Sequence, residues 1–228
     1  MSWYAKPSGS YGYNSFEGKA NIGEMNAFFN VRGYTLEAQA GIMGNAMGES
    51  GLNPWRWQSD RVSASGGYGL FQYTPASGYI NDMAHLEYYA PNLSVTEITS
   101  GASPTDGIAQ CEVFADNLLG KWMTSCWRTY WDKDTYPDLW NVRTNILNLY
   151  GDGQRLTMSN FKNIDNVYYA TFAFLACFEG PAVPNMSARY DYASDIYSML
   201  TGDTPDTPDN PPQKRKKMPI WMLLRYGL

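Results

Sequence analysis

One carboxylic acid stands at the end of an apolar helical pattern, and this is where the sequence first points to chemistry. The acid is Glu49, within residues 44–54, Gly-Asn-Ala-Met-Gly-Glu-Ser-Gly-Leu-Asn-Pro. Apolar residues precede it at helical spacing: Leu36, Ala40, Met43 and Met47. We therefore expect Glu49 at the end of a buried helix, where apolar walls raise the pKa of a carboxyl while one side stays open. This placement is typical of a proton donor.

A glycine-rich segment follows at residues 67–75, Gly-Tyr-Gly-Leu-Phe-Gln-Tyr-Thr-Pro. It predicts a tight bend that brings backbone and the Gln72 amide close to whatever Glu49 acts on. Delivery of a proton to a leaving oxygen is what cleavage of a glycosidic bond requires. An isolated Glu-Ser-Gly is typical of an ordinary exposed helix end, so the case for chemistry depends on the second segment.

Together these segments resemble a known superfamily. Glu-Ser-x-x-x-Pro at Glu49, then Gly-x-Gly-Leu-Phe-Gln ending at Gln72, then a Thr-Pro helix start, resemble lysozymes and soluble lytic transglycosylases. Gly-Asn ahead of Glu49 and Asn-Pro after it bring the pattern closer to the phage tail lysozyme family. A third segment, Phe178-Glu179-Gly180-Pro181 followed by Arg189, resembles that family's Phe-Glu-x-Pro segment and last helix.

The resemblance covers roughly residues 20–200 and implies both fold and activity. The implied fold is mainly α, a lysozyme-like two-lobed domain with a small irregular β or loop region. The implied substrate is bacterial peptidoglycan, with Glu49 as general acid. Gln72 and the backbone around Gly69 would contact the sugar N-acetyl group or the scissile bond. The remaining implied substrate-binding residues are Tyr68, Tyr73, Trp55, Trp57, Phe178 and Glu179. Core filling is the alternative for each aromatic ring.

The second catalytic group is open. Hen-type lysozymes have an aspartate where this chain has Gly67. We favour Asp60 as the base that activates water, which in an inverting reaction needs carboxyls ~6.5–9.5 Å apart. Glu179 could instead approach from the other lobe, or serve as a structural acid that binds Arg189. In the third alternative the substrate's own N-acetyl group attacks and leaves a 1,6-anhydro product, as in transglycosylases.

Charge and composition argue against several kinds of partner and site. The chain carries 17 basic and 22 acidic groups, and five of the basic groups lie in residues 214–228, which hold no acid. Residues 1–213 therefore have a net charge of 12 − 22 = −10, which argues against a nucleic-acid partner. One histidine and three cysteines without a CxxC pair predict no metal site, no cofactor and single thiols. The chain has no export signal pattern and no ~18-residue apolar run, so we expect synthesis in the host cytoplasm.

The expected organisation has four parts: an N-terminal arm at 1–15, a catalytic domain at 16–201, a Pro/Asp-rich linker at 202–213 and a C-terminal docking tail at 214–228. The basic and then apolar tail favours docking onto other phage tail proteins over a membrane anchor. We thus expect a virion component that opens the cell wall locally during genome ejection. Alternatives are a lytic transglycosylase using the same acid, a non-catalytic wall-binding or structural tail protein, and a free endolysin.

Helix signals place the elements that must position the site. Expected helices span about 16–32, a segment capped by Thr35 and reaching Glu49, 75–88, 103–125, 167–178 capped by Asp165, and 187–200 stopped by Gly202. Residues 50–73 should hold short irregular strands at most. Residues 127–163 give no clear pattern.

Overall fold

The computed structural model describes residues 3–83, 106–124, 133–153, 155–181 and 183–205. It is mainly helical, which confirms the expected lysozyme-like fold class. The helices are α1 (Phe16–Val31), α2 (Leu36–Ser50), α3 (Ala76–Met83), α4 (Asp106–Ala115), α5 (Pro137–Tyr150), α6 (Met158–Phe161), α7 (Val167–Phe174) and α8 (Met186–Thr201). Two short elements complete the set, the 3₁₀ turn η1 (Gln58–Asp60) and the π-helical turn η2 (Leu175–Glu179).

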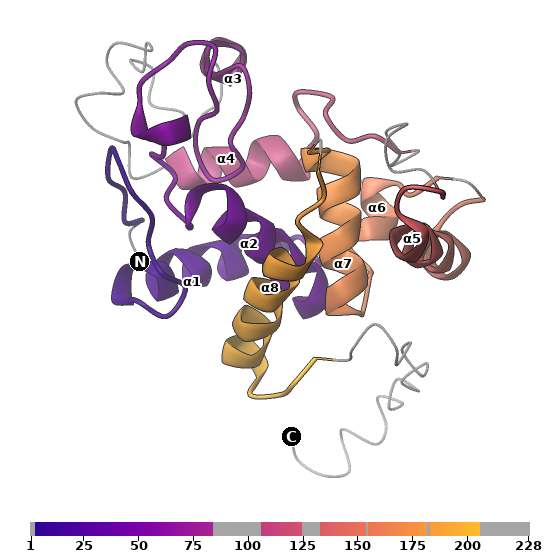
Figure 1. The fold of residues 1–228 in the computed structure, drawn as a ribbon. Coiled ribbons are helices and arrows are strands. Elements are labelled where there is room, and N and C mark those ends of the chain that lie inside the picture. The colour runs from indigo at the N-terminus through magenta and orange to yellow at the C-terminus, as the bar shows by residue number, and fades with distance from the viewer. Residues whose placement is uncertain (1–2, 84–105, 125–132, 154, 182, 206–228) are drawn as a thin grey trace.

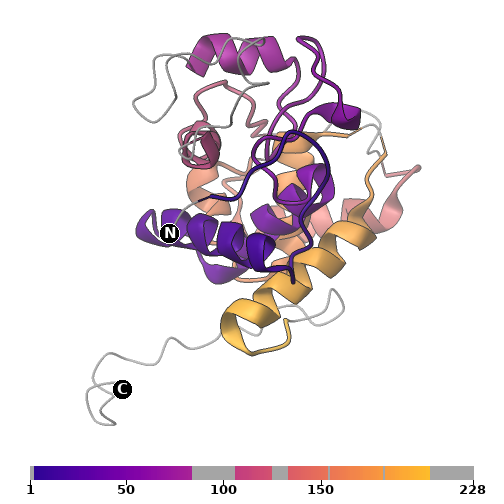
Figure 2. The same cartoon turned by 90° about the vertical axis from the view of Figure 1, so that its left-hand side faces the viewer.

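Helix α2 is the centre of the fold. It contacts α7 and α8, which also contact each other, and α1 packs against it as well (Figure 1). The irregular segment 51–75, with η1 and α3, lies beyond the C-terminal end of α2. Figure 2 shows α3 at the opposite end of the molecule from the C-terminal end of α8. The end of α2 therefore meets the irregular segment, and Glu49 lies at that junction.

Two glycines let the neighbouring helices approach the α2 backbone. A Cβ atom on Gly41 would lie 2.7 Å from the backbone of Ala170 in α7. A Cβ on Gly44 would lie 2.6 Å from the Cβ of Ala193 in α8 and 2.7 Å from the carbonyl oxygen of Arg189. Side chains at these positions would separate the helices, so the two glycines fix the spacing.

Several predicted helix boundaries are confirmed. The Thr35 side chain accepts a hydrogen bond from Ala38 N and caps α2. Helix α1 ends next to Gly33, and α8 ends at Gly202, whose φ of 78° is the left-handed conformation that glycine adopts without strain. On the inner face of α8, Ala193 and Ile196 are buried and Tyr190 is partly buried.

Other boundaries were wrong. Asn166, not Asp165, caps α7 by accepting from Tyr169 N at 2.8 Å, while Asp165 accepts a bond from the Tyr150 hydroxyl. Helix α7 also gives way at Leu175 to η2, which widens the turn ahead of Glu179. Helix α4 ends at Ala115, ten residues before the predicted end, because the chain turns through left-handed residues at Asn117 and Gly120.

The region without a clear sequence pattern contains α5 and α6. The predicted end of the third helix at residue 88 and the predicted start of the fourth at residue 103 lie outside the described residues. The same is true of most of the linker and of the whole tail at 214–228.

Polar side chains hold segment 51–75 in place. The segment has only isolated β-bridges, which agrees with the prediction of short irregular strands at most. The buried Asn53 donates to the carbonyls of Lys6 and Gly9 at 2.8 and 2.9 Å and so fastens the N-terminal arm. The buried Gln110 of α4 accepts from Leu70 N at 2.5 Å and donates to the Pro54 carbonyl at 2.7 Å. The buried Asn21 donates to the carbonyls of Tyr4 and Leu52. These three side chains join backbone segments that are far apart in the sequence.

Cys111 and Cys177 are both buried, and no disulfide joins the described cysteines, whereas Cys126 lies outside the described residues. A helix long and apolar enough to cross a membrane is not found in the described part of the chain.

Candidate active site

Glu49 lies in the last turn of α2, at the edge of the molecule's interior. Its side chain is about one-fifth exposed. The helix ends at Ser50, one residue later, because Gly51 takes the left-handed conformation, with φ of 59°. Ser50 fastens this end to the irregular segment by a hydrogen bond from its hydroxyl to the Leu70 carbonyl at 3.0 Å. The helix end and the glycine-rich bend are therefore held in one fixed relation.

The carboxylate of Glu49 is paired with Arg189 of α8. Arg189 Nη2 donates to Glu49 Oε1, and Arg189 Nη1 donates to the carbonyl and side-chain oxygens of Asn45, each at 3.2 Å. Asn45 in turn donates to the Thr171 carbonyl of α7 at 3.1 Å. Three helices thus determine where the Glu49 carboxylate points, and Arg189 is itself only 8% exposed.

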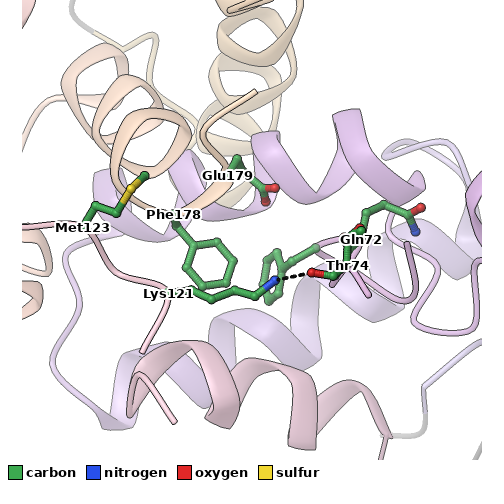
Figure 3. A pocket seen from close by; sticks show the side chains of 7 residues that line it. Gln72, Thr74, Lys121, Met123, Phe178 and Glu179 are labelled. Carbon is green, nitrogen blue, oxygen red and sulfur yellow. Dashed lines mark hydrogen bonds between the residues drawn. The ribbon is translucent and has the colours of Figure 1, made fainter. Parts of the chain in front are cut away.

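Two adjoining hollows open beside Glu49. The first has a volume of about 350 Å³ and is lined by Glu49, Arg56, Gln58, Ser59, Gln72, Thr74, Glu179 and Pro181. The second, shown in Figure 3, has a volume of about 400 Å³ and is lined by Phe71, Gln72, Thr74, Lys121, Met123, Phe178 and Glu179. Gln72, Thr74 and Glu179 line both, so the two hollows form one cleft with Glu49 on one side.

Glu179 is the second carboxyl that lines the cleft among the described residues. It ends η2, and its side chain points into the space between Lys121 and Gln72 (Figure 3). Its Oε1 atom is buried and accepts no hydrogen bond within the described part of the protein. Burial, and secondly the charge of Glu49, raise the pKa of Glu179 well above 4.5, although Arg189 and Lys121 oppose the shift.

Lys121 supplies a positive charge at the opposite wall. Its Nζ donates to the Thr74 carbonyl at 3.3 Å and lies 5.3 Å from the centre of the Tyr73 ring. Burial lowers the pKa of Lys121, and the charge of Glu179 acts in the other direction. The lining of the cleft therefore carries two acids, Glu49 and Glu179, and two basic side chains, Arg56 and Lys121. Arg189 does not line the cleft but pairs with Glu49.

The predicted amide, Gln72, does line the cleft, whereas the backbone at Gly69 does not. Gln72 Nε2 donates to the carbonyls of Arg56 and Gly69, at 3.2 and 3.0 Å. Both bonds use the amide nitrogen, and neither uses the amide oxygen. A Cβ on Gly69 would lie 2.2 Å from Gln110 Oε1, so Gly69 packs against the interior side of the bend. Its φ of 80° and this close approach explain the glycine.

The aromatic residues predicted to bind sugars divide into two groups. Trp57, Tyr68 and Tyr73 are at most 1% exposed and pack in the core, so the structure brings none of these rings to the cleft surface. Trp55 is partly buried and packs against the same core. Phe178 lines the second hollow, where its ring lies beside Lys121 (Figure 3).

Asp60, predicted as the base, lies outside the cleft. It is exposed on η1, accepts from Gly9 N at 2.8 Å and pairs with Arg56 Nε at 3.3 Å. Gly67 is buried, and a Cβ there would lie 2.9 Å from Gln72 Oε1. A side chain at position 67 would therefore require the Gln72 side chain to shift.

Several site residues were missed by sequence reasoning. A bond between Arg189 and Glu179 was one alternative from the sequence, but the carboxylate that Arg189 binds in the described structure is that of Glu49. A lone arginine at helical spacing with Ala193 and Ile196, on an inward face, was the available signal. Lys121 and Gln110 gave no signal, because nothing in the local pattern shows which distant backbone or cavity they reach. No group of residues able to hold a metal ion occurs within the described ranges.

The mainly helical fold and the carboxyl at the end of α2 define a lysozyme-like protein. Residues 20–200 match the phage tail lysozyme family, and the chain belongs to that family. A curated relative is morphogenesis protein 1 of Bacillus phage B103, which is 29% identical over 175 residues. The match covers 75% of this chain and 36% of that protein, so this chain corresponds to little more than a third of its relative.

Proposed function

We propose that this protein is a peptidoglycan-cleaving glycosidase of a phage particle, with Glu49 as the general acid. The observation that carries the proposal is the position of Glu49. Three helices hold its carboxylate at the wall of a cleft that also contains an amide and a second carboxyl. Membership of the phage tail lysozyme family supports the same substrate class.

The cleft residues suggest how the reaction proceeds. A glycan strand bound in the cleft places a glycosidic oxygen against Glu49, which protonates that oxygen as the sugar–oxygen bond breaks. Gln72, at the boundary of the two hollows, is in position to hold an N-acetyl group. The positive charge that develops on the sugar ring is stabilised by the carboxylate that Glu49 becomes after it gives up the proton.

Glu49→Gln is the direct test of the acid. The amide keeps the shape and still accepts a hydrogen bond from Arg189, but it carries no transferable proton. We expect the full-length variant to fold, judged by circular dichroism, and to lose its ability to clear purified cell walls by at least about 100-fold. Retained clearing by a folded Glu49→Gln variant would sink the assignment.

A lytic transglycosylase is the second candidate, and one observation favours it over a hydrolase. Position 67 carries no carboxyl, and Asp60, which lines neither hollow, is bonded to Gly9 and Arg56. Neither the hen-type position nor the predicted base therefore supplies a carboxylate to the cleft, and attack by the substrate's own N-acetyl group needs none. Mass spectrometry of the released fragments separates the two, because 1,6-anhydro ends mark transglycosylation and reducing ends mark hydrolysis.

The name of the phage relative bears on where the enzyme acts. The relative from phage B103 is named as a morphogenesis protein, which favours a place on the virion over a free lysis enzyme. We propose that the enzyme is carried on the phage tail, docked through residues 214–228, and opens the wall locally during genome ejection. Detection of the protein in purified virions supports this placement, and its confinement to the lysed-cell supernatant would contradict it.

A further inference from the structure

We propose that Glu179 is the proton-holding partner of Glu49: the two carboxyls share one proton in the free enzyme, and Glu179 passes it to Glu49 for cleavage. This inference rests on the proposed function and assigns Glu179 as a positioning residue that acts through Glu49.

The environments of the two carboxyls differ in the way that a shared proton requires. Glu49 accepts a hydrogen bond from Arg189, an arrangement that favours its ionised form. Glu179 Oε1 is buried and accepts no hydrogen bond in the described structure, an arrangement that favours the neutral acid. The Glu49 and Glu179 side chains both line the first hollow. When two carboxyls lie close together with unequal surroundings, the proton resides on the less solvated one.

The charged groups around Glu179 come from three elements. Glu49 of α2 raises the pKa of Glu179, after the larger effect of burial, and Arg189 of α8 and Lys121 lower it. The uncharged Gln72 and Thr74 face it from the irregular segment. Arg56 lines the same hollow from that segment. The charge on Glu49 thus bears directly on whether Glu179 holds its proton.

The proton transfer balances without any further reactant. The proton leaves the Glu179 carboxyl and binds the Glu49 carboxylate, so Glu179 becomes negative as Glu49 becomes neutral. Arg189 and Lys121 both lower the pKa of Glu179, so they stabilise the charge that appears there. Glu49 then gives the proton to the glycosidic oxygen. This sequence explains how an acid that is paired with an arginine in the free enzyme acquires the proton that it donates.

The activity test compares full-length wild type with Glu179→Gln and Glu179→Asp across pH. In Glu179→Gln no neighbouring carboxyl can pass a proton to Glu49, which stays paired with Arg189. We expect Glu179→Gln to lower kcat by about 10- to 100-fold and to move the alkaline limb of the rate profile down by about one pH unit or more. Glu179→Asp, which can still hold a proton, should recover part of both. Asp191→Asn, an exposed change on α8, is the matched control.

A second measurement needs no activity at all. Carbon NMR of carboxyl-labelled Glu should show one resonance titrating well above 4.5 in wild type, absent in Glu179→Gln and shifted down in Glu49→Gln. The free energy of unfolding should also depend on pH through Glu179. Because the folded-state pKa of Glu179 is raised, its contribution to stability is fully present below about 4.5 and is lost as pH rises through the folded value. Glu179→Gln should therefore melt higher relative to wild type at pH 8 than at pH 4.

These readouts keep the two proposals apart. If wild type releases no wall fragments while the raised titration is present and depends on Glu49, the glycosidase proposal fails and proton sharing stands. If wild type cleaves walls and Glu179→Gln shows an unchanged pH profile, the partner role of Glu179 is overturned. An ordinary titration of Glu179 in NMR would overturn it as well.

Discussion

The packed helices α2, α7 and α8 and the irregular segment 51–75 both hold the cleft, but by different means. The helices meet by shape, since Gly41 and Gly44 let backbones come into contact. The segment is held by hydrogen bonds from a few buried amides, among which Gln110 reaches both Pro54 and Leu70.

The difference shows how the protein divides its work. Helices α2 and α8 carry Glu49 and Arg189, and the turn η2 that continues α7 carries Glu179. The segment contributes Gln72 and Thr74, which are uncharged and line both hollows. We infer that close packing sets the electrostatics of the site, whereas the amide-held segment shapes the surface that meets the substrate.

The sharpest challenge to this comparison is Gln110→Ala. It removes two short hydrogen bonds and leaves the Leu70 amide and the Pro54 carbonyl without that partner inside the protein. We expect a loss of about 3 kcal/mol in the free energy of unfolding, together with reduced activity, because the bend bearing Gln72 loosens.

Urea denaturation measures the Gln110→Ala effect, with Asn148→Ala, exposed on α5, as control. A loss no greater than that of the control would show that the segment does not depend on its buried amides.

Gly44→Ala tests the helical side. The new methyl group would meet the Ala193 Cβ at 2.6 Å and the Arg189 carbonyl at 2.7 Å, so α8 must move away from α2. Overpacking of this kind costs about 2 kcal/mol, and displacement of Arg189 should also lower activity.

The matched control for Gly44→Ala is Gly23→Ala in α1, where a Cβ meets nothing within 4 Å. It should stabilise the protein by about 0.5–1 kcal/mol, since alanine favours the helix. Equal melting temperatures for the two variants would refute the close-contact account.

Asp60→Asn should have the smallest effect. Asp60 is exposed and lines neither hollow, so we expect cell-wall clearing within about threefold of wild type, where loss of a general base typically costs 10²–10⁴. Its bond to Gly9 and its pair with Arg56 are surface interactions worth about 0.5 kcal/mol. A loss of 100-fold or more in a turbidity assay would restore Asp60 as the base and show that the loop closes on the substrate.

The helical half was largely predictable from the sequence. Apolar residues at helical spacing, the Thr35 cap and the Gly202 stop are local signals, and all three led to the observed helices. The prediction of Asp165 as the cap of α7 was wrong because Asp165 and Asn166 are adjacent and either side chain can cap a helix. Asp165 instead accepts a hydrogen bond from the Tyr150 hydroxyl.

The polar contacts of the cleft were not predictable in the same way. The bond between Arg189 and Glu49 joins residues 140 positions apart, and a sequence pattern does not specify which of two nearby glutamates an arginine reaches. Tyr68 and Tyr73 are residue types that often bind sugars, but both are buried in the core. Their burial depends on the whole fold, which the local sequence pattern does not specify.

The central claim is that Glu49 supplies the proton that breaks the glycan strand. Its most direct test is quantitative mass spectrometry of purified peptidoglycan digested with equal amounts of full-length wild type and Glu49→Gln. We predict new glycan ends from wild type and none above background from the variant, with both proteins giving the same circular dichroism spectrum. New ends released at the wild-type rate by a folded Glu49→Gln variant would contradict the account.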